Sequence, residues 1–352
     1  MNTGLQREIS ILSEERGCLE AKRTRTARRR FTDDEDLLVS GIDPFLIDSE
    51  LKIAPSKAVR RMLDKTQVLT NPRNLHIRKR ITHAGEVTSA ASFIAALLGL
   101  NVELARAIAL GHDIGHPPFG HDGEAFLNTL VPNRAFKHEI MGVVIAQHIE
   151  RGGKGLNLTH EVLSGFVRDA WPKVVGEKIP PMSEEAKVVM WADRFAYVTG
   201  DYNDMERIGY QKRAELDELM QSFGMNQRER VNKLITALVG ESARMGGVAF
   251  YGSQMAEAFC RAKNLMYEAY PLLNASNADS ILSKIYEFLQ KILKGQGVDP
   301  ALAFALMTDN DVMFLASQPI LDYSCFAQVT VAELLPHLAN REIKWWDPDL
   351  KW

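Results

Sequence analysis

Cysteine is scarce in this sequence, and the few cysteines exclude the usual frameworks built from them. The 352 residues contain only Cys18, Cys260 and Cys325, an odd number at wide separations. Neither a disulfide scaffold nor a metal site made of thiolates has this pattern. The scarcity favours a protein of the reducing cytoplasm, which is the location we expect.

Long apolar runs and an excess of basic charge are also missing. The most apolar stretch, residues 90–100, is too short and too rich in small residues to span a bilayer, and the N-terminus shows no apolar signal core. The formal net charge of -3 gives no general basic field of the kind that coats nucleic acid. We therefore expect a protein without a membrane partner.

One local basic patch lies near the N-terminus. A run of lysines and arginines at positions 22–30 is followed directly by an acidic run at 33–36. Three interpretations of this arm stay open: a solvated segment, a contact between subunits, or a site that binds the phosphates of single-stranded nucleic acid weakly.

Alternating patterns typical of strands are missing as well, and helical periodicity takes their place. No alternating run is long enough to require a sheet. Segments with apolar side chains at helical spacing, or with a helix start signal, are 56–70, 78–100, 102–113, 122–131, 138–150, 159–171 and 183–204. The sequence therefore predicts an all-α protein.

Helix breaks and the position of the chemical groups suggest three parts. We predict an N-terminal arm and lead-in segment over 1–54, a catalytic core over 55–210, and an α-helical region over 211–352 that packs on the core. Residues 210–352 contain a single histidine, His337, so the chemistry is concentrated in the first two parts.

Reactive side chains gather in one stretch, residues 111–124, which reads GHDIGHPPFGHDGE. It holds three of the nine histidines, two aspartates and a glutamate. The pattern at 102–113 predicts that His112 and Asp113 stand at the end of a helix. The glycines and prolines that follow predict a tight, rigid turn.

Two more positions complete a candidate metal site. His83 lies on the inward face of the helix predicted at 78–100, and Asp193 lies on the helix predicted at 183–204. With His112 and Asp113 they offer two imidazoles and two carboxylates, a set that suits divalent Mn, Fe, Co, Ni, Zn or Mg. The identity of the metal stays open because no thiolate contributes.

Each of these residues has an ordinary explanation when taken singly. His83 suits a hydrogen-bonded core histidine, a His-Asp pair arises by chance, and Asp193 could form a surface ion pair with Arg194. The combination favours a site, because so many ionisable groups are costly to bury without a metal or a substrate.

The same segments resemble the HD-domain phosphohydrolases, and among them the deoxynucleoside triphosphate triphosphohydrolases, or dGTPases. RITH at 80–83 looks like the family's R-L-T-H, and HDIGHPPFGH at 112–121 matches its most specific signature. FKHE at 136–139 and ADRFAY at 192–197 resemble two further family elements. The resemblance covers residues 55–210 and implies an HD-domain helical bundle with an additional α-helical C-terminal region.

The resemblance implies roles for the residues at matching positions. Four residues would bind a divalent metal ion, such as Mn, Mg, Fe, Co or Ni: His83, His112, Asp113 and Asp193. Three would surround the α-phosphate: His116, His121 and His138. His121 is the best candidate for the acid that protonates the leaving oxygen, with Glu124 as its partner, because a carboxylate raises the proton affinity of an imidazole.

Other candidates would recognise the charged tail and the sugar of a nucleotide. Arg80 and Arg194 would neutralise the triphosphate. Gln67 aligns with a family glutamine near the 3'-hydroxyl. Tyr197 could pack on the ribose and exclude a 2'-hydroxyl, and Asp201 could accept from the 3'-hydroxyl; a core aromatic and a solvated helix residue are the alternatives.

The chain departs from the family pattern in two places. Gly85 stands inside a predicted helix where relatives often carry leucine, at a cost of about 1 kcal/mol relative to alanine. Arg194 replaces a residue that is frequently acidic. Base preference and effector control therefore stay open.

The sequence accordingly predicts metal-dependent hydrolysis of a deoxynucleoside triphosphate, with dGTP favoured, to the deoxynucleoside and tripolyphosphate. The resemblance also implies a homo-oligomer. Two alternatives remain. One is an HD-domain phosphohydrolase acting on another nucleotide, such as a monophosphate or an alarmone, and the other is a non-catalytic regulator that binds nucleotides or nucleic acid.

Overall fold

The computed structural model describes residues 3–69, 74–130, 135–167, 182–211, 213–273 and 278–352. Every regular element in these residues is helical, and the one β-type pairing among them is an isolated antiparallel bridge between Thr66 and Lys79. The predicted all-α fold is confirmed.

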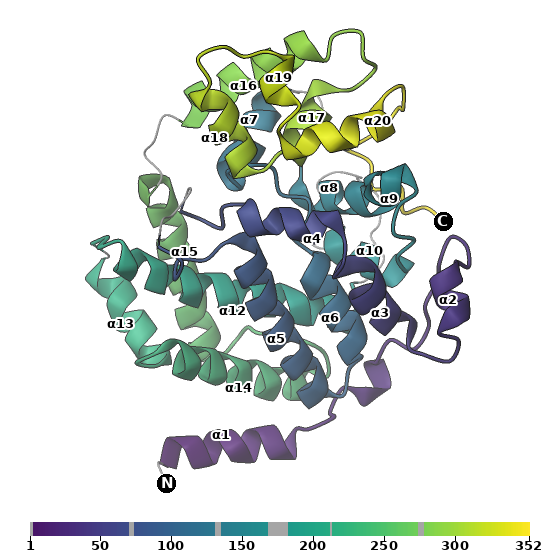
Figure 1. Cartoon of the computed structure of the whole chain (residues 1–352). Helices are drawn as coiled ribbons and strands as arrows, with labels where there is room; N and C mark the ends of the chain where they lie inside the picture. The colour runs from purple at the N-terminus through teal and green to yellow at the C-terminus, as the bar shows by residue number, and fades with distance from the viewer. Residues whose placement is uncertain (1–2, 70–73, 131–134, 168–181, 212, 274–277) are drawn as a thin grey trace.

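Three helices at the centre of the molecule carry the core: α5 (Arg80–Leu98), α6 (Val102–Gly111) and α12 (Glu184–Arg207), which pack against one another (Figure 1). α6 begins where predicted, because the Asn101 side chain accepts a hydrogen bond from the backbone N–H of Leu104 at 3.0 Å. The short connection between α5 and α6 makes them antiparallel, so the start of α5 lies beside the end of α6.

Shorter helices surround this end of the core. They are α4 (Lys57–Arg61), α7 (His121–Leu130), α8 (His138–Val144), α9 (Glu150–Gly153) and α10 (His160–Val167), with a π-helical segment at Ile145–Ile149. Gly115, in the turn between α6 and α7, must be glycine, because a Cβ there would overlap the His138 carbonyl and the backbone N of Gly142. The turn therefore packs directly against α8.

The helix predicted at 56–70 is shorter than expected. α4 is followed by a 3-10 turn at Met62–Asp64, and the chain then becomes extended. The extension is fixed from outside: the backbone N–H of Arg80 donates to the Lys65 carbonyl at 3.1 Å, next to the bridge described above. Residue 70 and the last part of the helix predicted at 159–171 lie outside the described residues.

The N-terminal arm is bound to the rest of the chain. Its helices are α1 (Thr3–Glu14), α2 (Asp34–Leu38) and α3 (Pro44–Ile47), with a 3-10 turn at Glu20–Lys22 and a π-helical segment at Asp48–Ile53. Four of its arginines form ion pairs: Arg25 with Glu20, Arg28 with Glu161, Arg29 with Asp36 and Asp48, and Arg30 with Asp349. Weak binding of single-stranded nucleic acid by this arm stays a prediction.

The C-terminal region packs on the core in two groups. The first lies beside α12 and α5 and consists of α13 (Ala214–Phe223), α14 (Gln227–Met245) and α15 (Gln254–Leu273). The second covers α7 at the opposite end (Figure 1). It consists of α16 (Ala278–Ile292), α17 (Pro300–Leu306), α18 (Asp309–Ser317), α19 (Tyr323–Phe326), a 3-10 turn at Thr330–Leu334 and α20 (Leu335–Leu338).

By length and composition, α5 is the one described helix that could cross a membrane. Core helices of globular proteins meet the same criteria, so this is weak evidence. α5 stands at the centre of the bundle, and it buries Arg80 and His83 along with its apolar face. We interpret it as a core helix.

Substitution by alanine at two helical glycines should have opposite effects on stability. A Cβ at the exposed Gly85 in α5 would meet no atom within 4 Å, so Gly85→Ala should raise the free energy of unfolding by about 0.5–1 kcal/mol. A Cβ at Gly111 in α6 would overlap the Phe166 ring, so Gly111→Ala should lower it by about 1–3 kcal/mol. Urea unfolding of both variants measures the difference, and a shift of the same sign would contradict the packing described.

Candidate active site

The four predicted metal ligands come together from three central helices. His83 Nε2 on α5 lies 2.9 Å from Asp193 Oδ1 on α12. His112 Nε2, at the end of α6, lies 3.3 Å from Asp113 Oδ1 and 3.7 Å from Asp193 Oδ1. The antiparallel α5 and α6 produce this meeting, because they bring the first turn of one helix beside the last turn of the other.

The donor set fits a divalent metal ion. His112 Nδ1 donates to the Ala109 carbonyl at 2.7 Å, so in the neutral ring Nε2 carries no proton and has a free lone pair. That nitrogen is buried and has no hydrogen-bond partner. Ligand atoms of His83, His112 and Asp113 all lie within 4.8 Å of one another. A buried lone pair beside carboxylates is costly unless a cation binds there, so the cluster suits a metal site.

Arg80 holds one of these ligands in place. Its Nη1 donates to Asp113 Oδ2 at 2.8 Å, while Nε and Nη2 donate to the carbonyls of Thr66 and Gln67 at 2.8 and 3.0 Å. All three nitrogens are thus engaged within the protein. Burial alone would raise the pKa of Asp113, but the positive charge around it, which includes the Arg80 guanidinium, holds that pKa well below its usual range. Arg80 therefore orients Asp113, and contact with a triphosphate stays a prediction.

Three histidines form a second cluster beside the metal ligands. The rings of His116 and His138 stack with centroids 3.7 Å apart, and His121 lies edge-on to His116 at 5.3 Å. Burial and the neighbouring Arg80 lower the pKa of His121 to about 4 and hold that of His116 well below its usual value. At neutral pH both rings are therefore uncharged.

His138 carries the charge in this cluster. Burial would lower its pKa, but the carboxylates of Glu139 and Glu124 raise it to about 9. Glu124 accepts from His138 Nδ1 at 2.7 Å and from Lys137 Nζ at 2.9 Å. Both Glu124 oxygens thus accept at the start of α8, and Glu124 acts on His121 only through its charge, which raises the His121 pKa against the larger effect of burial. The predicted partnership of Glu124 and His121 in catalysis stays a prediction.

A cavity of about 580 Å³ joins these clusters to an aromatic wall. All the predicted site residues except His112 and Glu124 line it, and Lys263, Tyr267 and Tyr270 of α15 line its far side. The α15 residues were missed because no motif marks them. Aromatic residues at helical spacing, Tyr267 and Tyr270, were the one available signal.

The far side of the cavity is polar, and Lys263 is among its residues. Asp201 accepts from Tyr270 Oη at 2.9 Å, and burial raises the Asp201 pKa to about 7. The hydroxyls of Tyr197 and Tyr267 lie 3.1 Å apart. Gln67 Oε1 is buried without a hydrogen-bond partner. This end can therefore receive hydroxyl groups, whereas the histidine end suits anions.

Arg194 lies at the same cavity, with its guanidinium over the Trp191 ring at 4.9 Å. Its position is compatible with the predicted contact to a phosphate tail, which stays a prediction.

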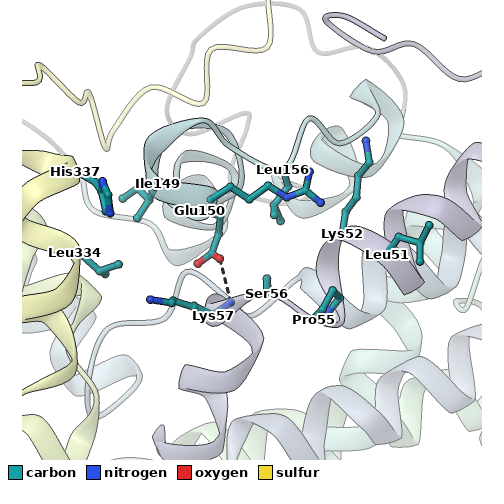
Figure 2. Close-up of a pocket in the computed structure, with 12 residues that line it drawn as sticks. Leu51, Lys52, Pro55, Ser56, Lys57, Ile149, Glu150, Leu156, Leu334 and His337 are labelled. Atoms are coloured by element: carbon teal, nitrogen blue, oxygen red, sulfur yellow. Dashed lines mark hydrogen bonds between the residues drawn. The ribbon is translucent and has the colours of Figure 1, made fainter. Parts of the chain in front are cut away.

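A second cavity, of about 300 Å³, lies between α4, α9 and the C-terminal helices (Figure 2). Its charged side chains are satisfied within the chain. Lys57 pairs with Glu333 and Arg151 with Glu35, and Glu150 accepts from the Lys57 backbone at 3.0 Å and from Arg61 at 3.1 Å. Its lining holds one histidine, His337, and one carboxylate, Glu150, in place of the clusters of the larger cavity.

Comparison with known proteins agrees with this geometry. The HD domain family model matches residues 80–198, which contain all four candidate metal ligands. The fold and the buried cluster therefore define an HD-domain phosphohydrolase. A "Deoxyguanosinetriphosphate triphosphohydrolase-like protein" of Clostridium tetani is 32% identical over 286 residues, 74% of this chain and 80% of the relative. The chain belongs to this family of dGTPase-like proteins.

Other similarities are more limited in extent. A relative of the same name from Clostridium perfringens is 40% identical over 196 residues, which is 54% of this chain and 55% of that protein. Among solved structures, a hypothetical protein from Aquifex aeolicus covers 87% of this chain with 18% identity and a TM-score of 0.45. A likeness of that size supports no conclusion about the site.

The raised pKa of Asp201 predicts a pH-dependent stability. The Asp201 pKa is about 7 in the folded protein and 3.8 ordinarily. The neutral carboxyl therefore contributes its full stabilisation of the fold below pH 3.8, and this contribution is lost as the pH rises through 7. Asp201→Asn should therefore gain in Tm relative to wild type between about pH 5 and about pH 8. The matched control is Asp217→Asn. In the wild type the Asp217 carboxylate accepts a hydrogen bond from the Tyr202 hydroxyl at 2.9 Å, nearer the surface. A gain independent of pH would contradict the prediction.

Proposed function

We propose that this protein hydrolyses a deoxynucleoside triphosphate, with dGTP favoured, to the deoxynucleoside and tripolyphosphate. One observation carries the proposal: a single cavity joins the candidate metal ligands, a histidine cluster with one charged member, and a polar end lined by tyrosines and Lys263. Such a cavity matches a ligand with an anionic phosphate tail and a neutral sugar.

The reacting phosphorus would lie beside the candidate metal ligands. His83, His112, Asp113 and Asp193 would hold a divalent ion, which when bound activates water and polarises a phosphoryl oxygen. Arg80 keeps Asp113 ionised and oriented at 2.8 Å. The residues of the chain thus supply a fixed, buried ligand set before any substrate arrives.

The histidine cluster would bind the negative charge of the phosphates and supply the proton that the leaving oxygen needs. Water attacks the α-phosphorus, the bond from phosphorus to the 5'-oxygen breaks, and that oxygen needs a proton. His138, already charged through Glu124, suits the binding of a phosphate oxygen. His121 suits the proton transfer, because the approach of an anionic triphosphate raises its low pKa.

The polar end would recognise the sugar. Gln67 presents a buried oxygen without a partner, and Asp201 can accept from the 3'-hydroxyl. Tyr197, bonded to Tyr267, presents a rigid ring to the ribose face. We propose that this ring leaves no room for a 2'-hydroxyl, which favours deoxynucleotides.

The proposal predicts a specific pair of products. Incubation with each deoxynucleoside triphosphate in Mg²⁺, Mn²⁺ or Co²⁺ should release tripolyphosphate, seen by ³¹P NMR, and the deoxynucleoside, seen by chromatography. The ribonucleoside triphosphates should be hydrolysed far more slowly. The rate should be highest for dGTP. Release of orthophosphate or pyrophosphate, or turnover of a monophosphate only, would point to another HD-domain phosphohydrolase.

Two variants separate the metal from the proton donor. Asp193→Ala should lose both Mn²⁺ binding, measured by EPR titration, and turnover. His121→Ala should keep Mn²⁺ affinity and lose turnover of dGTP by about 10²–10⁴-fold. It should lose far less on bis(p-nitrophenyl) phosphate, whose leaving group needs no proton. Equal losses of His121→Ala on both substrates would contradict its role as the acid.

A further inference from the structure

An aspartate of the C-terminal region reaches the two loops that support the site. Asp309, the first residue of α18, is only 4% exposed. Its Oδ2 accepts from the backbone N–H of Thr66 at 2.8 Å and also from the Thr66 hydroxyl. Its Oδ1 accepts from the backbone N–H of Phe119 at 2.8 Å. One carboxylate therefore joins two segments that are distant in sequence.

The first segment leads to the candidate metal site. Thr66 and Gln67 offer their carbonyls to Arg80, and Arg80 in turn holds Asp113. A displaced Thr66 would withdraw two of the three acceptors that orient the Arg80 guanidinium. Asp309 thus acts on Asp113 through two intermediate residues.

The second segment leads to the histidine cluster. Phe119 has φ +59°, a left-handed conformation that is unfavourable for a residue with a side chain. It lies between His116 and His121, and the next residue, Gly120, packs so closely on Arg80 Nη2 that a Cβ would lie 3.0 Å from it. The bond from Phe119 to Asp309 stabilises this strained turn.

We propose that Asp309 is a positioning residue for the active site. It does not itself line the cavity, and it keeps the Thr66 segment and the Phe119 turn in register so that Asp113, His116 and His121 are held as a unit. The inference that Asp309 supports catalysis rests on the proposed function. The inference that Asp309 supports the metal ligands does not, because it follows from hydrogen bonds within the protein.

The matched control is Asp311 on the same helix. It is also buried, at 6% exposed, and its oxygens accept from the backbones of Thr308 at 3.0 Å and Thr330 at 2.9 Å, both within the C-terminal region. Asp309→Asn and Asp311→Asn each replace a buried acceptor pair by an amide of the same size. A purely structural role would make them alike.

The experiment compares the two variants with wild type at a temperature where circular dichroism shows all three folded. Asp309→Asn should weaken Mn²⁺ binding by about tenfold, in the range of changes to residues that support metal ligands. It should lower kcat at saturating Mn²⁺ by about tenfold or more, with a smaller change in KM. Asp311→Asn should stay within twofold of wild type in these quantities, by the same reasoning.

A second comparison tests the path through Thr66. Thr66→Ser keeps the hydroxyl that donates to Asp309 and should retain wild-type Mn²⁺ affinity, whereas Thr66→Val should show part of the Asp309→Asn loss. In the double variant the two losses should not add, because both remove the same contact.

The outcomes are separable from those of the proposed function. A wild type that hydrolyses no deoxynucleoside triphosphate would end the proposed function, while the Mn²⁺ affinities would still test Asp309. If Asp309→Asn matched Asp311→Asn in both Mn²⁺ affinity and kcat, the positioning role would be overturned. A loss confined to kcat would support a positioning role exerted through the hydrogen bond from Phe119, which holds the turn between His116 and His121.

Discussion

The buried negative charge of Asp113 is the constraint on which the rest of the site depends. A carboxylate removed from water is stable only when cations and donors surround it, and here Arg80 approaches it at 2.8 Å. Arg80 is itself buried and needs acceptors of its own, which are the carbonyls of Thr66 and Gln67. The site therefore extends well beyond its ligands. The extended backbone after α4 supplies two carbonyl acceptors to the Arg80 guanidinium.

The matched HD domain does not contain all the residues that line or support this site. Thr66 and Gln67 precede residues 80–198, and Asp309 and the α15 tyrosines follow them. Thr66 and Gln67 supply the acceptors for Arg80, which holds Asp113, and α15 lines the far side of the cavity. Each contribution is a hydrogen bond or a ring placed from another part of the chain. The helical region after residue 211 is thus part of the site as well as of the core.

The cavity changes in character along its length. At one end lie carboxylates and bare imidazole nitrogens, and next to them stands a charged His138 beside two neutral histidines. At the other end a buried Asp201, three tyrosines and Lys263 offer polar atoms. A low-dielectric cavity strengthens each of these interactions, so the order of groups along it selects the orientation of a ligand. Under the proposed function, the phosphates of a nucleotide would lie at the first end and its sugar at the second.

Much of this was determined by the sequence alone. Helical periodicity predicted α5, α6 and α12, Asn101 predicted the start of α6, and the histidines and aspartates of 83, 112, 113 and 193 predicted a metal site that the structure brings together. These are properties of residue type and local spacing. Only the tertiary structure decided that Glu124 serves His138, that Arg80 holds Asp113, and that Asp309 joins two loops. A hydrogen-bond partner depends on which helix ends and loops meet in space, and spacing along the chain carries no information about that meeting.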